Sequence, residues 1–189
     1  VPYGLDLLSF GGYASPVPGR VLFVGSVGLR KGVPYLAEAA RRLMRTHPHI
    51  EVQVIGPSEP GVTAHPAFAG PRYLGQVPRS QVVEAFRCAD VFVLPTIADS
   101  FALVHLEAMA AGVPVITTPN CGATVRDGIE GFIVPIRDSQ ALVDRILAIT
   151  EDRELRKRMS AAARARAAEF SLDRYAQRLL DAVTPVLEI

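Results

Sequence analysis

The stretch RVLFVGSVGLRKGVPYLAEAARRLMRT, residues 20–46, decides the fold of this chain. It opens on a short apolar run, RVLFVG (20–25), that is typical of a buried β-strand and ends in a glycine-rich turn. The turn leads into a predicted helix over 33–46, in which Leu36, Ala40 and Leu43 recur at helical spacing and share one face. Strand, turn and helix in this order begin a βαβ unit, the building block of parallel sheets.

The same alternation continues along the chain. Further strands are predicted at 51–56, near 72–77, and at 90–95, 112–117 and 131–135. Helices are predicted at 79–88 and 101–111, and three more, at 139–150, 152–170 and 172–186, complete the chain. We therefore expect an α/β fold: a Rossmann-like parallel sheet of about six strands flanked by helices, with a helical C-terminal tail.

Composition and charge exclude several classes of protein. With 189 residues, 49% of them hydrophobic and 21% charged, the chain has the size and composition of one globular domain. The net charge of +1 gives no reason to expect a nucleic-acid partner, and glycines and prolines interrupt the longest uncharged run, 108–125, so no transmembrane segment is predicted. A start at Val1 without a signal peptide indicates an excised fragment of a cytoplasmic protein. Cys88 and Cys121 are far apart, without histidines at ligand spacing, so we expect two reduced, buried thiols and no metal site.

Parallel α/β sheets bind their ligands beyond the carboxyl ends of the strands, so the loops there are the first places to search. The loop GSVGLRKG (25–32) has neither the spacing of a dinucleotide-binding turn nor the ending of a P-loop. It places Arg30 and Lys31 at a helix start, where backbone N–H groups and the helix dipole also attract an anion. A phosphate-bearing ligand fits this arrangement. In the alternative interpretation the two side chains are merely exposed there, although cations are unfavourable at a helix N-terminus.

The loop PTIADSFALVHLE (95–107) predicts a second anion site. Ser100 is a good N-cap, and Phe101, Ala102 and Leu103 would then form a first helical turn with unpaired N–H groups. These groups would lie at the carboxyl edge of the sheet, as the first loop does.

Three polar side chains of the same segment have competing interpretations. Glu107 lies in a nearly apolar helix, where a carboxylate needs hydrogen bonds, either from a vicinal diol such as a ribose or from a structural arginine. Asp99 precedes the expected N-cap and either reaches hydroxyl groups beside the phosphate or serves as a turn residue. His105 faces another side of the helix and is interpreted as a packing residue rather than a catalyst.

Five segments together resemble a known enzyme family. DSFALVHLEAMAAGVPVI (99–116) resembles the EX7E segment of the retaining family 4 glycosyltransferases with the GT-B fold, and FVGSVGLRKG (23–32) resembles their donor-phosphate loop. YLGQVP (73–78), RCADVFVLP (87–95) and VRDGIEGFIVP (125–135) match the same family in the same order. The resemblance implies the C-terminal, nucleotide-sugar-binding half of a two-domain enzyme. Its parts would be a linker over 1–19, the Rossmann-like domain over 20–170, and a helix over 171–189 that crosses to the missing N-terminal domain.

The resemblance also implies roles for the matching positions, with Lys31, Asp99 and Glu107 as the catalytic residues. Glu107 would bind the ribose, and Asp99 and Ser100 the donor sugar. The donor phosphates would be bound by Ser26, Arg30, Lys31, Phe101, Ala102 and Leu103, and the base by the backbone of Gly75, Gln76 and Val77. No metal and no cofactor are implied, because cationic side chains and helix dipoles would stabilise the departing diphosphate.

Three positions depart from the family pattern. Ser26 stands where the family often has arginine, Asp99 replaces the first glutamate of EX7E, and Ala102 replaces a glycine in the phosphate-binding turn. Ala102 is expected to crowd the approach of the backbone to the ligand.

The function implied is transfer of a hexose-type sugar from a UDP-, GDP- or ADP-sugar to a glycan or lipid precursor. The fragment is not expected to transfer sugar without its N-terminal domain, through which the enzyme could also attach to the inner membrane face. A non-catalytic nucleotide-sugar-binding or partner module is the alternative. An NAD-dependent oxidoreductase is disfavoured by the missing GxGxxG.

Overall fold

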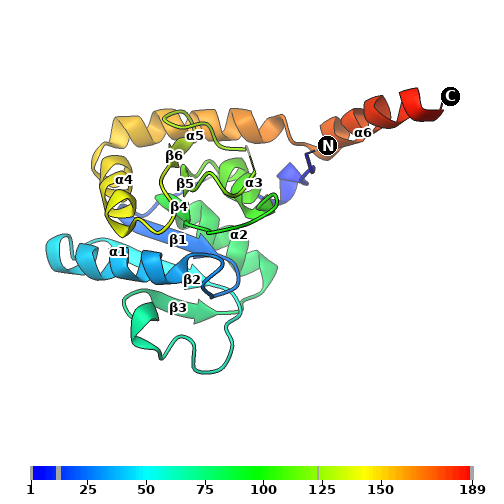
Figure 1. Ribbon diagram of the computed structural model, residues 1–189. Helices are drawn as coiled ribbons and strands as arrows, with labels where there is room; N and C mark the ends of the chain where they lie inside the picture. The colour runs from blue at the N-terminus through cyan, green and yellow to red at the C-terminus, as the bar shows by residue number, and fades with distance from the viewer. Residues whose placement is uncertain (1, 12–13, 123, 188–189) are drawn as a thin grey trace.

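The computed structural model describes residues 2–11, 14–122 and 124–187 of the chain. Its centre is a six-stranded sheet with the order β3-β2-β1-β4-β5-β6, in which all neighbouring strands run parallel (Figure 1). The strands are β1 (Arg20–Val24), β2 (Glu51–Ile55), β3 (Arg72–Gly75), β4 (Val91–Leu94), β5 (Val115–Thr117) and β6 (Gly131–Ile133). The predicted α/β class and parallel sheet are confirmed.

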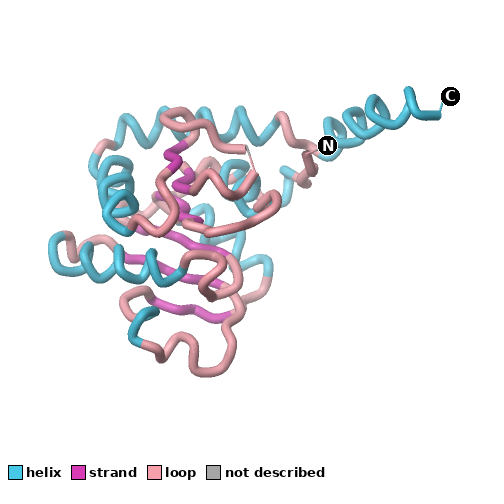
Figure 2. The backbone as a smooth tube through the Cα atoms, in the orientation of Figure 1, coloured by secondary structure: helices cyan, strands magenta, loops and turns pink. Residues whose placement is uncertain are grey.

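Helices cover the sheet on both sides. They are α1 (Val33–Thr46), α2 (Arg79–Cys88), α3 (Leu103–Ala110), α4 (Ser139–Glu151), α5 (Arg153–Ala168) and α6 (Leu172–Leu187), with short 3-10 turns η1 (Leu7–Ser9) and η2 (Pro66–Phe68). Helices α1 and α4 pack against each other, α5 packs along α3 and α4, and η2 lies against α1. Helix α6 leaves this body and projects outward, as the tube of Figure 2 shows.

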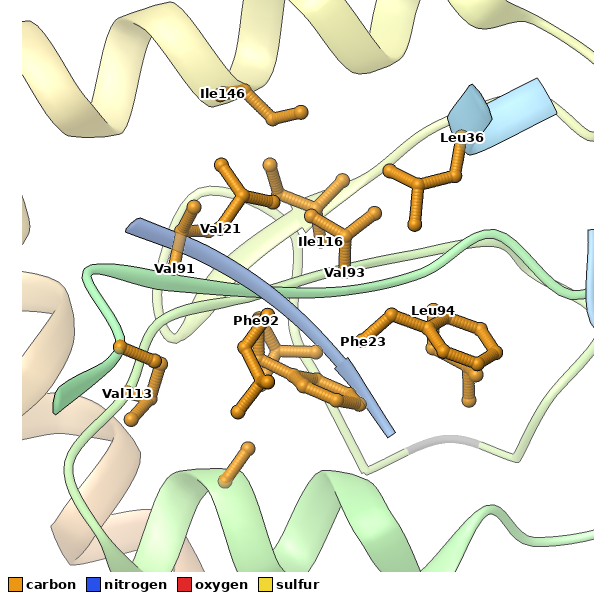
Figure 3. Close-up of a cluster of buried hydrophobic side chains, with 14 of the residues drawn as sticks. Val21, Phe23, Leu36, Val91, Phe92, Val93, Leu94, Val113, Ile116 and Ile146 are labelled. Atoms are coloured by element: carbon orange, nitrogen blue, oxygen red, sulfur yellow. The ribbon is translucent and has the colours of Figure 1, made fainter. Parts of the chain in front are cut away.

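The central strands are apolar on both faces because each face is covered. All four residues of β4 are fully buried. Val93 points toward the side that carries Ile146 of α4, and Phe92 points to the opposite side (Figure 3). There its ring meets Phe86 of α2 and His105 of α3, at centroid distances of 5.6 and 6.2 Å. A continuous apolar strand is what burial on two faces requires.

The loops after β1 and β4 meet at the centre of the sheet, where the strand order changes direction. Gly32 makes this possible: its φ is +72°, and a Cβ atom there would lie 1.8 Å from the carbonyl oxygen of Pro95. The carbonyl oxygen of Arg30 accepts hydrogen bonds from the Ile97 N–H at 2.8 Å and the Thr96 hydroxyl at 2.9 Å. The two loops are therefore bonded into one surface.

Both edge strands are short. On one edge, β3 is largely exposed, and its pairing with β2 shifts register between Val54 and Ile55. On the other edge, β6 has three residues. The irregular pairing and the short strands leave little continuous backbone available at either edge of the sheet.

Most elements lie where the sequence predicts, with differences at their ends. The strand predicted at 112–117 forms only over Val115–Thr117, and the helix predicted at 101–111 begins two residues later, at Leu103. Cys121 is buried as expected, but the prediction of a buried Cys88 is wrong. Cys88 is only half-buried because it lies on the outer helix α2, with its Sγ 3.5 Å from a carboxylate oxygen of Glu84.

Helix α6 contacts the body through its first two turns: Tyr175 has a ring contact with Tyr3, and Arg178 donates to the carbonyl oxygens of Glu169 at 2.8 Å and Pro2 at 3.4 Å. Its apolar side chains are uncovered: Leu180 is 61% exposed. The predicted crossing to a missing domain stays a prediction, and residues 1, 12 and 13 of the predicted linker and 188–189 of the predicted last segment lie outside the described residues. None of the helices in the described parts of the chain is both long and apolar enough to span a membrane.

A buried carboxylate fixes α5 to the amino end of the sheet. Asp90, fully buried, accepts hydrogen bonds from the Gly19 N–H at 2.9 Å and from Arg153 at 2.6 Å. Its other oxygen lies 2.7 Å from Nε of Arg156, a residue only 6% exposed. Removing one partner of such a pair leaves an uncompensated buried charge.

We expect Asp90→Ala to lower the free energy of unfolding by about 3–5 kcal/mol, since Arg156 would remain buried without its partner. Urea denaturation measures the change. The control is Glu154→Ala, which removes an exposed ion pair with Lys157 and should cost no more than about 0.5 kcal/mol. Equal losses in the two variants would contradict the structural role of Asp90.

Candidate active site

A hollow of about 460 Å³ opens at the carboxyl end of the sheet, where the loops after β1 and β4 meet. The first loop contributes Gly25, Ser26 and Lys31, and the second contributes residues 99–104. Val24 at the end of β1, Glu107 of α3 and Tyr3 from the N-terminal segment complete the lining. Most of the residues that the sequence singled out for phosphate, ribose and sugar binding are thus brought together around one pocket.

Lys31 and Asp99 form an ion pair across this pocket. The Lys31 ammonium donates to Oδ2 of Asp99, and both side chains are largely covered, with exposed fractions of 15% and 12%. The Ser100 N–H donates to the other oxygen of Asp99 at 2.9 Å, and the Arg30 guanidinium lies 4.0 Å from it. Partial burial acts to raise the pKa of the Asp99 carboxyl, but the hydrogen bond and charge of Lys31 outweigh it and hold that pKa below its ordinary value.

The start of α3 differs from the prediction. Ser100 is not the N-cap: this position belongs to Ala102, whose φ of 34° and ψ of 67° are left-handed and whose side chain cannot accept a hydrogen bond. Phe101 therefore precedes the helix, and the first turn begins at Leu103. The prediction failed because a left-handed residue inserted two positions after the serine turns the chain before the helix can start. The amide ends of α3 still border the pocket, at Leu103 and Val104.

Glu107 lies on the pocket side of α3, and both surroundings expected for its carboxylate, an arginine and a ligand-binding pocket, are found there. Its side chain is 18% exposed and lines the hollow, and a carboxylate oxygen lies 3.9 Å from Nη1 of Arg79. Burial raises the pKa of the Glu107 carboxyl above its ordinary value, an effect that the charge of Arg79 opposes. Glu107 is thus a carboxylate with an arginine at one side and an open pocket at the other.

Two residues of this region were not found from the sequence. Arg79 reaches Glu107 from the first turn of α2, and its guanidinium lies over the ring of Phe10, 4.9 Å from the centroid. The sequence did hold a signal for this role of Arg79. A positive charge at the start of a predicted helix is disfavoured by the helix dipole unless an acidic group is near. Tyr3 lies edge-on to the ring of Phe101 at 5.4 Å, a contact for which the sequence holds no signal.

The residues predicted to bind the base lie outside this hollow. The Gly75 carbonyl accepts a hydrogen bond from the Gly56 N–H at 2.9 Å, and Gln76 is exposed beside it. Val77 lines a separate hollow with Leu74 and Gln81. The base-binding role of Gly75, Gln76 and Val77 stays a prediction. Among the described residues no cluster of three or more histidine, cysteine or acidic side chains could hold a metal ion.

Comparison with known proteins identifies the family to which this site belongs. The family described as "Glycosyl transferases group 1" matches residues 16–166. The chain belongs to this family. A relative from Geodermatophilus obscurus, named D-inositol 3-phosphate glycosyltransferase, is 36% identical over an alignment of 185 positions that covers 89% of this chain. The chain spans only 40% of the length of that relative.

Solved glycosyltransferase structures share the fold. Sucrose-phosphate synthase from Thermosynechococcus elongatus superposes with a TM-score of 0.83 at 25% identity, over 100% of this chain and 52% of that one. Anabaena Alr3699/HepE, solved in complex with UDP and glucose, superposes with a TM-score of 0.80 at 19% identity, over 96% of this chain and 55% of that one. The structure is therefore the Rossmann-like half of a GT-B glycosyltransferase, as predicted.

The left-handed backbone at Ala102 allows a test of local strain. An L-residue with a side chain pays about 1 kcal/mol for this conformation, so Ala102→Gly should raise the free energy of unfolding by about that amount. The same substitution at the end of the same helix, Ala110→Gly, should lower it by about 1 kcal/mol. Denaturant titration measures both, and equal destabilisation would mean that Ala102 carries no backbone strain.

The raised pKa of Glu107 predicts a pH dependence of stability. The folded state binds the Glu107 proton more tightly than the unfolded state, so this group destabilises the fold as pH rises through its folded pKa. Glu107→Gln should therefore melt at a higher temperature than the unchanged protein at pH 7, and the difference should vanish below the ordinary glutamate pKa of 4.5. Glu154→Gln, at an exposed carboxylate, serves as the control and should show no such trend. A difference in melting temperature that persists at low pH would refute this explanation.

Proposed function

We propose that this chain is the donor-binding half of a retaining glycosyltransferase that moves a hexose-type sugar from a nucleotide-sugar to an acceptor. The observation that carries the proposal is the Lys31–Asp99 pair, which joins the loops after β1 and β4 at the mouth of the pocket. A cation that could bind a diphosphate thus lies next to a carboxylate that could accept hydrogen bonds from sugar hydroxyl groups.

The phosphate end of the donor is assigned to the Lys31 side of the pocket. Lys31 is largely covered, and Arg30 lies beside it with a side chain that is 64% exposed and able to move. The amide ends of α1 and α3 add partial positive charge, although α3 is too short to act alone. Ser26 can add a hydroxyl donor where the family often has an arginine.

The hydroxyl groups of the donor are assigned to the two carboxylates. Glu107 would accept the ribose hydroxyls, because its oxygens face the pocket and burial makes an unbonded carboxylate costly. Asp99, with Ser100, would accept hydroxyls of the sugar. When the diphosphate draws Lys31 away, Asp99 regains the lone pairs that the ammonium now occupies.

The chemistry assigned to this half is stabilisation of the leaving group. An oxocarbenium-like transition state leaves growing negative charge on the departing diphosphate, and fixed cations and amide dipoles at that place lower the barrier. Retention of anomeric configuration and independence from metal are parts of this proposal. The neighbour that was solved with UDP and glucose supports a nucleotide-sugar donor, with UDP-, GDP- and ADP-sugars all open.

The acceptor and the other wall of the cleft are assigned to a domain that precedes this one. The chain spans 40% of the length of its Geodermatophilus relative, and α6 carries a row of uncovered apolar side chains that a second domain would cover. Transfer of sugar would then require both halves.

Calorimetric titration of the chain with UDP-, GDP- and ADP-sugars, and with NAD, tests the proposal. We expect one nucleotide-sugar to bind more tightly than NAD. Absence of binding to every nucleotide-sugar, or tighter binding of NAD, would overturn it. Binding without turnover in the full-length enzyme would favour the non-catalytic alternative.

In the same titration, Lys31→Ala should weaken binding of the nucleoside diphosphate by about 1–3 kcal/mol, the value of a charge-assisted contact. Lys157→Ala is the matched control because it removes the other lysine of the chain, which is exposed in α5 and paired with Glu154. Equal affinities for the two variants would contradict the phosphate role of Lys31.

A further inference from the structure

His105 is a buried polar group that the proposed function does not use. It lies on α3, two positions before Glu107, and is fully buried. Its Nε2 lies 3.1 Å from the Thr117 hydroxyl at the end of β5, and its Nδ1 lies 3.3 Å from the Thr124 hydroxyl. A buried imidazole needs polar partners, and those of His105 come from outside its own helix.

The imidazole belongs to a group of buried polar atoms. Besides Nε2 of His105, the Thr117 hydroxyl lies 3.2 Å from the Leu94 carbonyl oxygen and 2.7 Å from Sγ of Cys121. Both ring nitrogens thus have polar partners at the end of β5 or in the segment that follows it. Burial lowers the pKa of the His105 ring to about 3, which favours the neutral imidazole.

The segment after β5, which contacts His105, also forms a hydrogen bond with the backbone of Asp99. Between Thr117 and Thr124, the Asn120 carbonyl accepts the Asp99 N–H at 2.9 Å, and the Asn120 side-chain amide donates to the Ile97 carbonyl at 2.8 Å. The segment after β5 is thus bonded to α3 on one side and to the loop of Asp99 on the other.

We propose that His105 is a positioning residue: its imidazole ties α3 to Thr117 and Thr124, and the segment after β5, through Asn120, orients Asp99 toward the donor sugar. The tie between elements stands on the contacts alone, and only its effect on the sugar rests on the proposed function. An apolar residue at this place would remove the hydrogen-bond partner of the buried Thr124 hydroxyl. His105 thereby couples the helix of Glu107 to the carboxylate on the far side of the pocket.

The first test needs no ligand. The Asp99 amide should exchange its hydrogen about tenfold faster in His105→Leu than in the unchanged protein, measured relative to amides of β1, because the segment that accepts it is loosened. His105→Gln, whose amide offers both a donor and an acceptor, should restore most of the protection. Unchanged exchange in His105→Leu would overturn the proposal.

A second pair of variants covers the case in which His105→Leu does not fold. Thr124→Val keeps the shape of the side chain and removes its hydroxyl, so it should also speed exchange of the Asp99 amide, whereas Thr124→Ser should not. Thr150→Val, which removes a buried hydroxyl bonded within α4, is the control and should leave that amide unchanged. Equal effects of the two valine variants would overturn the proposal.

The last measurement adds the donor. His105→Leu should reduce the ratio of nucleotide-sugar affinity to nucleoside-diphosphate affinity about tenfold, with little change for the diphosphate alone. Equal weakening of both ligands would show a general loosening and overturn the link to the sugar. If the unchanged protein binds no nucleotide, the proposed function fails, and the exchange data still decide whether His105 positions Asp99.

Discussion

The close approach of two loops at the centre of the sheet is the constraint on which the site depends. Gly32 has no side chain, so the loop after β1 can lie against Pro95 and share the Arg30 carbonyl with the loop after β4. Only then do Lys31 and Asp99, 68 positions apart, meet as an ion pair. In a doubly wound sheet the loops after the two central strands lead away from each other, which leaves a crevice between them. The hydrogen bonds between these two loops close the bottom of the crevice and make it a pocket.

The pocket concentrates groups that are costly to the fold. A left-handed alanine, a half-buried carboxylate with a raised pKa and a largely covered lysine all line this one pocket. The stability that offsets them comes from elsewhere: from β4, buried on both faces, and from Asp90, which ties α5 to the opposite end of the strands. In proteins, local backbone strain is commonly concentrated at functional sites, and the stability of the surrounding structure offsets it.

The sequence predicted the fold and the site loops because both follow from short patterns. A buried strand such as 90–95 has no polar alternation, and the loop after it must lie at the ligand-binding edge. What could not be predicted depends on contacts between distant segments. Ser100 was predicted to be the N-cap, but the left-handed turn at Ala102, which depends on tertiary structure, delays the start of the helix. Likewise, the partners of Arg79 and His105 come from other elements. The base-binding positions 75–77 remain a prediction from resemblance.

The short, irregular strands at the two ends of the sheet have a consequence for how this domain behaves among its own copies. A parallel sheet that stopped at a long, flat strand would offer its free N–H and C=O groups to any other strand and invite edge-to-edge aggregation. Here β3 is exposed but breaks register with its neighbour, and β6 ends after three residues. The sheet thus ends at both sides in strands that make poor templates for pairing, so other copies of this domain find little free edge to extend.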